Sequence, residues 1–323
     1  MSNPSNAGKP EVLSVANLSP FYAEPLQASC IVHHKLHETD PAAFAKIAPR
    51  IVAIAASGES KVGAELLAQL PALKTISVMG VGYDGVDVAA AKARGVMVTH
   101  TPGVLNDDVA DLAIALMLAV SRQIARADRY VRSGQWRSSG PMALGRKMSG
   151  ARVGIVGMGR IGQAIAQRAA AFNMSIAYTA RSAKPALPYT YHPTPATLAA
   201  ESDYLVVITP GGAATRKLID AAVLAALGPQ GCVVNVARGS VIDEAALIEA
   251  LRSGTIAGAG LDVFENEPDV PQALRDMDNV VLTPHIGSAT SQTRRAMAEL
   301  AYANLDAVLS GKPPVTPVPE CQS

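Results

Sequence analysis

The sequence feature that most constrains the fold is a group of three glycines between an apolar strand and an apolar helix. The segment VGIVGMGRIGQAIAQ places Gly157, Gly159 and Gly162 in GxGxxG spacing, after a strand predicted at 153–156 and before a helix predicted at 161–171. The first glycine allows a tight turn, the second lets the backbone approach a pyrophosphate, and the third lets the helix pack on the strand. We therefore predict an α/β sheet that binds a dinucleotide at the N-terminus of this helix. A glycine turn without a ligand is the alternative interpretation.

The rest of the chain extends the α/β interpretation, because strand-sized apolar runs alternate with helical patterns in two series. The runs predict strands at 12–15, 51–55, 75–79, 96–99, 152–156, 175–179, 204–208, 232–235, 258–261 and 280–282, and helices at 61–70 and 291–309. We expect the last helix to return to the first series. Boundaries near 101 and 290 then give a substrate domain, 1–101 with 291–323, and an inserted dinucleotide-binding domain, 102–290.

A long helix is predicted where the two series meet. Apolar residues recur at helical spacing from Val109 to Ile124, and Asn106 or Asp107 can cap the start. The apolar residues cover more than one stripe, so much of the helix should be buried. It suits an interdomain connector or a subunit interface.

Composition excludes several classes of function. Apolar residues make up 49% of the chain and charged residues 17%, with a formal net charge of +1 and no dense Lys/Arg run. This argues against nucleic acid as a partner. The apolar stretches are too short to span a membrane. Three cysteines without a CxxC pair and an N-terminus without an apolar signal core predict a cytoplasmic protein.

The choice of dinucleotide depends on the residues after the strand predicted at 175–179. An acid that would hold the ribose 2′-hydroxyl of NAD is expected there, but the sequence reads YTARSAK, with Arg181, Ser182 and Lys184. An arginine can hold a 2′-phosphate through two parallel hydrogen bonds, and one charge-assisted contact contributes about 1.5–3 kcal/mol. The sequence therefore predicts NADP(H) as cofactor. The alternative is that Arg181 is a solvated surface residue.

Three further motifs carry side chains suited to catalysis, each after a predicted strand. NVARGSVIDE holds Arg238, GLDVFENEP holds Asp262 and Glu267, and TPHIGSAT holds His285. All should lie at the carboxyl edge of a sheet, where open α/β folds bind ligands. An arginine can bind the carboxylate of a 2-keto acid, and a histidine can protonate the ketone oxygen during reduction. A neighbouring Glu267 would favour the imidazolium form of His285.

These motifs, together with GVGYDGVD and TPGVLNDDVADLAIALMLA, resemble the D-isomer-specific 2-hydroxyacid dehydrogenases over nearly the whole chain. The resemblance implies a dimer whose subunits each have two Rossmann-like domains with parallel sheets. It implies that Arg238, Glu267 and His285 are catalytic, and that backbone N–H groups of Val81 and Gly82 bind the substrate carboxylate. The implied cofactor-binding residues are Gly157, Gly159, Arg160, Ile161, Gly162, Arg181, Ser182, Thr209, Pro210, Val236, Asp262, His285 and Gly287.

Within that family, the segments DRYVRSGQW, ARSAKP and SGKPPVTPV are similar to glyoxylate/hydroxypyruvate reductases and plant-type hydroxyphenylpyruvate reductases. This closer likeness implies NADPH-dependent reduction of small 2-keto acids such as glyoxylate and hydroxypyruvate. Reduction of 4-hydroxyphenylpyruvate is an alternative activity. A nucleotide-sensing corepressor is an alternative of another class.

Two other features allow more than one interpretation. Trp136, the one tryptophan, is expected either to pack in a core or interface or to line the substrate pocket, reaching across a dimer. The histidines of HHKLH, His33, His34 and His37, lie where a strand is expected to give way to a loop, so we predict no metal site there.

Overall fold

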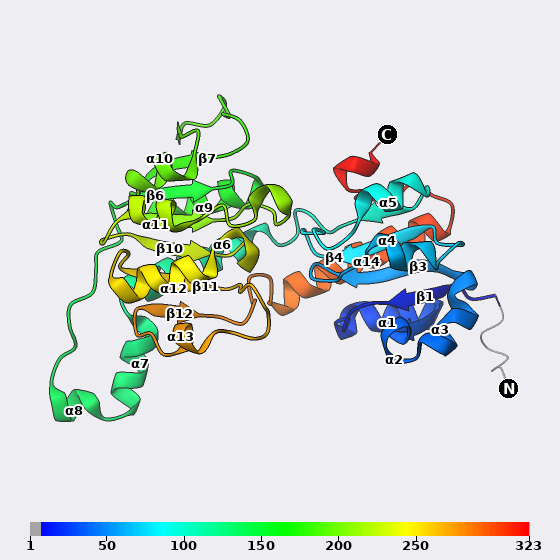
Figure 1. Ribbon diagram of the computed structural model, residues 1–323, viewed down its shortest axis with the longest axis horizontal. Coiled ribbons are helices and arrows are strands. Elements are labelled where there is room, and N and C mark those ends of the chain that lie inside the picture. The colour runs from blue at the N-terminus through cyan, green and yellow to red at the C-terminus, as the bar shows by residue number, and fades with distance from the viewer. Residues whose placement is uncertain (1–7, 323) are drawn as a thin grey trace. The chain divides into compact units, whose positions relative to one another are not determined.

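The protein divides into two compact units, which Figure 1 shows in a computed structural model that describes residues 8–322. One unit contains the chain up to Leu105 and again from Thr290 onward, and the other is Asn106–Ala289. Each unit is built on one sheet, and the strands of both sheets pair in parallel. The predicted α/β class with parallel sheets is confirmed. Most of the N-terminal segment that suggested a cytoplasmic location lies outside the described residues.

The first unit has a five-stranded sheet in the order β2-β1-β3-β4-β5. Its strands are β1 (Glu11–Ser14), β2 (Ile31–His34), β3 (Ile51–Ser57), β4 (Thr75–Met79) and β5 (Met97–Thr99). Its α-helices are α1 (Pro20–Ser29), α2 (Leu36–Thr39), α3 (Pro41–Ile47), α4 (Ala64–Ala68), α5 (Val88–Ala93) and α14 (Ser291–Leu309). Every residue of β4 is buried, which is why its sequence shows no polar alternation. Helix α4 is shorter than the helix predicted at 61–70.

The C-terminal part of the chain packs against this first sheet. Helix α14 lies on β4, and the buried hydroxyl of Ser77 donates to the carbonyl of Ala301 at 2.7 Å. Asn304, fully buried on the same helix, donates to the Thr316 hydroxyl at 2.7 Å and accepts from its backbone N–H at 2.8 Å. The segment after the helix then follows β5, where the N–H of Val318 donates to the carbonyl of Val98.

The second unit has a seven-stranded sheet in the order β12-β11-β10-β9-β6-β7-β8. Its strands are β6 (Arg152–Val156), β7 (Ser175–Thr179), β8 (Thr190–Tyr191), β9 (Tyr204–Val207), β10 (Cys232–Asn235), β11 (Gly258–Leu261) and β12 (Val280–Leu282). The strand order reverses at β6, which pairs with β7 on one side and β9 on the other. In open α/β sheets, ligands bind at the carboxyl ends of the strands at such a switch point.

Helices lie on both faces of this second sheet. The α-helices of the unit are α6 (Asn106–Ser121), α7 (Ile124–Arg132), α8 (Gln135–Ser139), α9 (Arg160–Ala171), α10 (Pro195–Ala200), α11 (Ala221–Leu227), α12 (Glu244–Ser253) and α13 (Gln272–Arg275), of which α8 lies away from the sheet (Figure 1). Side chains of α10, α11 and α12 form one apolar core with the strands. Helix α6 packs on the opposite face and against α9, where Arg168 pairs with Asp107 and Asp111.

The long helix predicted to run through Ile124 ends earlier, and that part of the prediction is wrong. Helix α6 stops at Ser121, whose hydroxyl bonds to the carbonyl of Met117 and to the hydroxyl of Tyr204. Gln123 then adopts a left-handed conformation with φ of 53°, which turns the chain out of the helix. Ile124 consequently begins α7 with 51% of its surface exposed instead of continuing a buried stripe.

The segment 122–147, here called the arm, carries α7 and α8 and then returns to the sheet. Four of its large apolar side chains are exposed: Ile124, Val131, Trp136 and Leu144. Leu144 is 96% exposed and Trp136 is 64% exposed. Packing of Trp136 in a core of this chain is therefore excluded.

The histidines of the HHKLH segment lie in β2 and in the short helix α2 that follows it. His34 ends β2, and the residues after Lys35 form the short helix α2 in place of the predicted loop. His33 lies 2.9 Å from the Glu11 carboxylate, which also pairs with Arg50.

Among the described residues, no helix combines the length and the apolar character that a membrane crossing needs.

Candidate active site

Predicted catalytic and cofactor-binding residues of the second unit follow three neighbouring strands at one edge of its sheet. Arg238 comes three residues after the end of β10, Asp262 directly follows β11, and His285 comes three residues after the end of β12. The turn that carries Arg238 is held by Asn235, whose amide donates to the Arg238 carbonyl at 3.0 Å and accepts from the Ala237 N–H at 3.1 Å. We call Arg238, Asp262, Glu267 and His285 the catalytic edge.

Gly239 brings two loops of the catalytic edge into direct contact. A Cβ atom at this position would overlap the backbone carbonyl of Phe264, so no other residue fits without moving one loop. Phe264 in turn donates its N–H to the carboxylate of Glu267 at 2.9 Å. The turn after β10 therefore fixes the loop that carries Glu267. Sequence reasoning missed this support, although the glycine stands in the quoted NVARGSVIDE motif.

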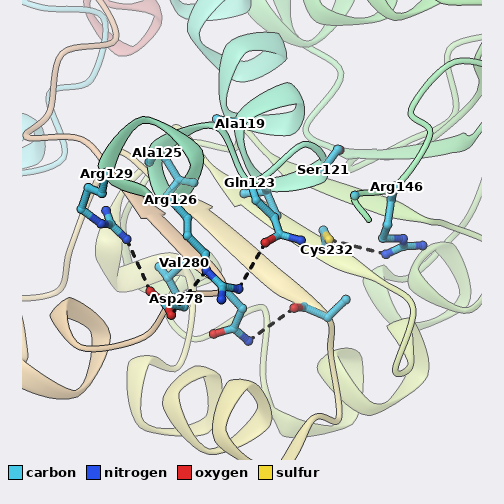
Figure 2. Close-up of a pocket in the computed structure, with 15 residues that line it drawn as sticks. Ala119, Ser121, Gln123, Ala125, Arg126, Arg129, Arg146, Cys232, Asp278 and Val280 are labelled. Carbon is cyan, nitrogen blue, oxygen red and sulfur yellow. Dashed lines mark hydrogen bonds and ion pairs between the residues drawn. The ribbon is translucent and has the colours of Figure 1, made fainter. Parts of the chain in front are cut away.

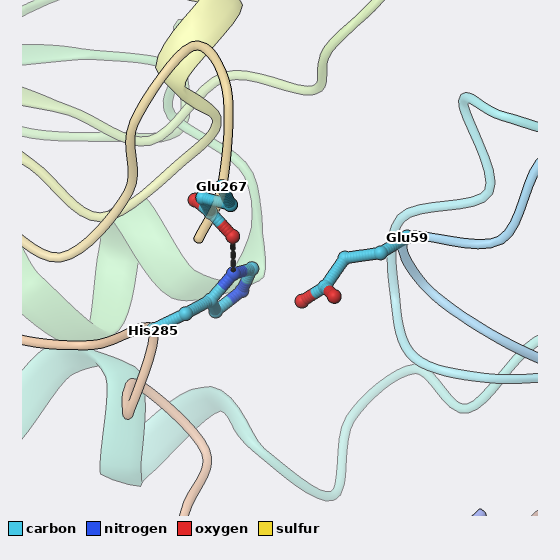
Figure 3. A group of neighbouring side chains, drawn as sticks. All are labelled: Glu59, Glu267 and His285. Carbon is cyan, nitrogen blue, oxygen red and sulfur yellow. Dashed lines mark hydrogen bonds and ion pairs between the residues drawn. The ribbon is translucent and has the colours of Figure 1, made fainter. Parts of the chain in front are cut away.

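Glu267 and His285 form a short hydrogen bond, which Figure 3 shows. The carboxylate oxygen lies 2.7 Å from Nδ1 of the imidazole. Desolvation opposes ionisation of Glu267, but the hydrogen bonds from His285 and from the Phe264 N–H outweigh it, so the pKa of Glu267 lies below its usual value. Glu267 is thus an anion at neutral pH. Nδ1 of the imidazole is therefore engaged by this anion.

The backbone of His285 is held in an unfavourable conformation by Asp262. His285 has φ of 52°, in the left-handed region that costs a residue with a side chain about 1–2 kcal/mol. The Asp262 carboxylate accepts from the Thr283 hydroxyl at 2.7 Å and from the N–H groups of Ile286 and Gly287 at 2.8 Å each. Three donors on both sides of His285 therefore converge on one carboxylate.

Asp262 is itself 1% exposed. Burial raises the pKa of its carboxyl, and the hydroxyl and two N–H donors offset part of that effect. Asp262 and Gly287 were both predicted to contact the cofactor. In the structure they bind each other, and their contact orients His285.

The glycine turn connects β6 to α9 at the switch point of the sheet. Gly157 has φ of +108°, and a Cβ there would lie 2.6 Å from the Ile208 carbonyl. Its N–H donates to the carbonyl of Thr179, the last residue of β7, at 2.9 Å. A Cβ on Gly162 would overlap the Gly157 carbonyl, so this glycine lets α9 lie against the turn. These contacts agree with the roles predicted for the first and third glycines.

The start of α9 fits a dinucleotide pyrophosphate. Gly159 is the N-cap residue, so no side chain at this position accepts a hydrogen bond from the first turn of the helix. A Cβ atom placed on Gly159 would have no other atom within 4 Å. The N–H groups that begin the helix at Arg160 and Ile161 are thus available to an anion, and the helix dipole favours one.

Other predicted cofactor residues surround this turn on adjacent strands. Thr209 and Pro210 come shortly after β9. The residue before them, Ile208, donates its N–H to the carbonyl of Val156, the last residue of β6. Val236 directly follows β10, is 7% exposed, and donates its N–H to the Val207 carbonyl. The structure thus brings these three residues to the carboxyl edge that holds the glycine turn.

Arg181 and Ser182 lie in the loop after β7, and both are exposed. Within residues 8–322, no carboxylate pairs with Arg181. Its guanidinium is therefore available to a ligand at the strand end next to the glycine turn.

The predicted substrate residues outside the catalytic edge lie elsewhere in the chain. Val81 and Gly82 belong to the first unit, in the loop after β4, where the Val81 carbonyl is 2.9 Å from Nδ1 of His100. Trp136 lies on α8, which Figure 1 shows away from the sheet of its own unit. Arg238 alone among the predicted substrate ligands lies at the catalytic edge.

A cavity of about 220 Å³ lies at the opposite edge of the second sheet (Figure 2). Its lining includes Cys232 and Val280, the first residues of β10 and β12. Arg126 and Arg129 of α7 also line it, and both pair with Asp278. This cavity belongs to the base of the arm and not to the catalytic edge. Sequence reasoning missed it because it depends on the turn after α6.

Comparisons with known proteins found a matching family model, relatives of similar sequence and a solved structure of similar fold. The family model described as D-isomer specific 2-hydroxyacid dehydrogenase, NAD binding domain, matches residues 114–287. Hydroxyphenylpyruvate reductase of Plectranthus scutellarioides is 49% identical over 84% of this chain and 86% of its own. Glyoxylate/hydroxypyruvate reductase A of Arabidopsis thaliana is 48% identical over 83% of this chain and 85% of its own.

A solved structure agrees with the fold along almost the whole chain. It is the NADPH-dependent glyoxylate/hydroxypyruvate reductase of Sinorhizobium meliloti in complex with NADP and malonate. The two proteins are 45% identical, with a TM-score of 0.92, over 97% of this chain and 98% of the other.

Proposed function

The chain belongs to the D-isomer-specific 2-hydroxyacid dehydrogenases, and we propose that it reduces small 2-keto acids such as glyoxylate and hydroxypyruvate with NADPH. The observation that carries the proposal is the 2.7 Å hydrogen bond between Glu267 and His285, next to the turn that carries Arg238. The relatives that bear these activities support it.

The chemistry follows from what each side chain can do. The guanidinium of Arg238 binds the carboxylate of the keto acid and polarises the adjacent ketone. NADPH, held by the glycine turn and Arg181, would supply a hydride to the carbonyl carbon and would be left as NADP⁺. The C=O π electrons then become a lone pair on the oxygen, and His285 donates a proton there, which yields the 2-hydroxy acid. Glu267 stabilises the imidazolium before the transfer, and solvent returns the proton afterwards.

NADPH is favoured over NADH because the loop after β7 offers the exposed Arg181 where an acid would hold a ribose. In wild type, kcat/KM for hydroxypyruvate should be higher with NADPH than with NADH. Arg181→Ala should reduce this ratio by about 10- to 100-fold, as expected for the loss of a charge-assisted contact. Arg252→Ala, which removes an exposed arginine on α12, is the control. Equal use of both cofactors by wild type would refute the preference.

4-Hydroxyphenylpyruvate is the second candidate substrate, favoured by the 49% identity to a hydroxyphenylpyruvate reductase. Comparing kcat/KM for glyoxylate, hydroxypyruvate and 4-hydroxyphenylpyruvate ranks the three. Absence of turnover with all of them would favour a nucleotide-sensing, non-enzymatic role instead.

We further propose that the protein is a cytoplasmic homodimer joined through the arm. The arm has an apolar surface made of the exposed side chains Ile124, Val131, Trp136 and Leu144. Contact with a second subunit would remove this surface from water. Trp136 of one subunit then lines the substrate pocket of the other. Light scattering should report a dimer for wild type and a monomer for Leu144→Asp. Unchanged selectivity among keto acids in Trp136→Ala would contradict the pocket role.

A further inference from the structure

The loop that carries Arg181 is tied down at one end by a buried tyrosine. Tyr178, in β7, is 1% exposed, and its hydroxyl accepts the backbone N–H of Lys184 at 2.6 Å. The tyrosine therefore reaches from the strand to the backbone six residues later in the chain. We call the residues from Ala180 to Lys184 the phosphate turn.

The other end of the phosphate turn is held more loosely by a second tyrosine. Tyr191 of β8 is the direct strand partner of Tyr178, and the two rings lie 5.5 Å apart. The Tyr191 hydroxyl donates to the Ala180 carbonyl at 3.5 Å. The three residues between the two anchored positions, Arg181, Ser182 and Ala183, are all exposed. The backbone is thus fixed at both ends while the middle of the turn faces solvent.

We propose that Tyr178 is a positioning residue for NADPH, which acts by fixing the phosphate turn so that Arg181 meets the 2′-phosphate. This inference rests on the proposed preference for NADPH. A guanidinium binds a phosphate well only in a defined fork geometry, and a loosely held loop must be ordered before it can bind. A buried hydroxyl that holds the Lys184 N–H does that ordering in advance. NADH lacks the 2′-phosphate, so it gains nothing from this order.

Tyr178→Phe tests the proposal because it removes one oxygen and keeps the ring. Dissociation constants for NADPH and NADH are measured by fluorescence titration, with kcat measured in parallel. The variant should bind NADPH about 3- to 10-fold more weakly, the loss expected when one loop side chain must be ordered on binding. NADH affinity and kcat at saturating NADPH should stay unchanged. Equal weakening of both cofactors, or no weakening, would overturn the proposal.

Tyr204→Phe is the matched control. It also removes a buried tyrosine hydroxyl from the same sheet, one that bonds Ser121 at 2.7 Å at the amino edge. It should leave the ratio of the two dissociation constants at the wild-type value. A change in that ratio equal to that of Tyr178→Phe would mean that the effect is general loosening of the unit, and would overturn the proposal.

A double-mutant cycle separates this inference from the proposed function. If Tyr178 acts through Arg181, then Tyr178→Phe changes nothing further in an Arg181→Ala background. Additive losses would overturn the positioning role while leaving the preference for NADPH intact. If wild type and Arg181→Ala do not differ, the proposed function fails first and the inference fails with it.

Hydrogen exchange of the Lys184 amide tests the structural step without any cofactor. The amide should be protected in wild type and exchange at least about 10-fold faster in Tyr178→Phe, since its buried acceptor is lost. Unchanged exchange would overturn the proposal even if cofactor binding changed.

Discussion

The catalytic edge and the phosphate turn lie along the same sheet but are held in opposite ways. At the catalytic edge, His285 is fixed through its ring by Glu267 and through its backbone by Asp262. In the phosphate turn, the side chain of Arg181 is exposed, and the tyrosine hydrogen bonds reach only the backbone on either side.

The difference follows from the task of each region. A group that transfers a proton must already point at the reacting atom, because reorganising it during the reaction raises the barrier. A group that recognises a charged phosphate can adjust on binding, provided that its backbone stays in place. Substitutions at the catalytic edge should therefore lower kcat, whereas substitutions in the phosphate turn should change only cofactor affinity.

The largest effect is expected for His285→Ala, which removes the proposed proton donor. Loss of a general acid typically lowers the rate by about 100- to 10,000-fold. Stopped-flow reduction of hydroxypyruvate at saturating NADPH gives the rate. A rate within threefold of wild type would show that another group supplies the proton.

Gly239→Ala should come next, since it adds one carbon where the loops touch. Relieving the overlap with Phe264 requires the Arg238 turn or the Glu267 loop to move, and overpacking of this kind costs about 1–3 kcal/mol of stability. We expect kcat to fall about 10- to 100-fold, because a shift near 1 Å can cost that much. Gly63→Ala is the control, since a Cβ there has nothing within 4 Å. Equal kcat values in the two variants would contradict the close approach.

Glu267→Gln should have a smaller effect that depends on pH. The amide cannot stabilise the imidazolium of His285 as the carboxylate does. The fall in kcat/KM for reduction at alkaline pH should therefore move to lower pH, and kcat at neutral pH should be reduced about 10-fold. The pH profile of steady-state reduction measures this. An unmoved alkaline limb would show that Glu267 does not influence the proton donor.

The same carboxylate links stability to pH. The pKa of Glu267 is lower in the folded protein than its usual value, so its stabilising contribution is present above the unfolded pKa. That contribution is lost as the pH falls through the folded value. The advantage of wild type over Glu267→Gln in urea unfolding should therefore shrink on acidification. A constant difference from neutral to acidic pH would contradict this.

Lys184→Ala should have the smallest effect. The backbone N–H that Tyr178 holds is unchanged, and only one partly exposed charge of the phosphate turn is lost. An exposed charge contributes about 0–1 kcal/mol, so NADPH should bind no more than about fivefold more weakly. Fluorescence titration at two salt concentrations measures this. A loss as large as that of Arg181→Ala would make Lys184 the main phosphate ligand.

Local sequence patterns predicted the second sheet well. The strands predicted at 152–156, 175–179, 232–235, 258–261 and 280–282 coincide with β6, β7, β10, β11 and β12. These strands are short, mostly apolar runs between polar turns, and β10 and β11 are buried along their whole length, which makes such runs easy to recognise. The strand β8 was not predicted, because two residues are too few to show an apolar periodicity.

The failures share a different cause. The end of α6 depends on Gln123, a residue type that gives no sign of a left-handed turn, and on a hydrogen bond between Ser121 and distant Tyr204. The motifs indicated Glu267, His285 and Asp262, but not the contacts that hold the first two in place. Gly239 supports the site through Phe264, and Asp262 does so through backbone donors beyond His285. Such long-range contacts leave no trace in the spacing of nearby residues.

The insertion of one unit within the other has a consequence for synthesis on the ribosome. All of the second unit has been made once Ala289 is added, whereas the first still lacks α14, which packs on β4. Domains tend to fold as units while the chain is made. The second unit should therefore reach its final structure first, although the strands of the first unit are made before it. Those strands complete their packing only when α14 has been made. Nascent chains arrested with Ala289 outside the exit tunnel should resist protease in the second unit and be cut in the first.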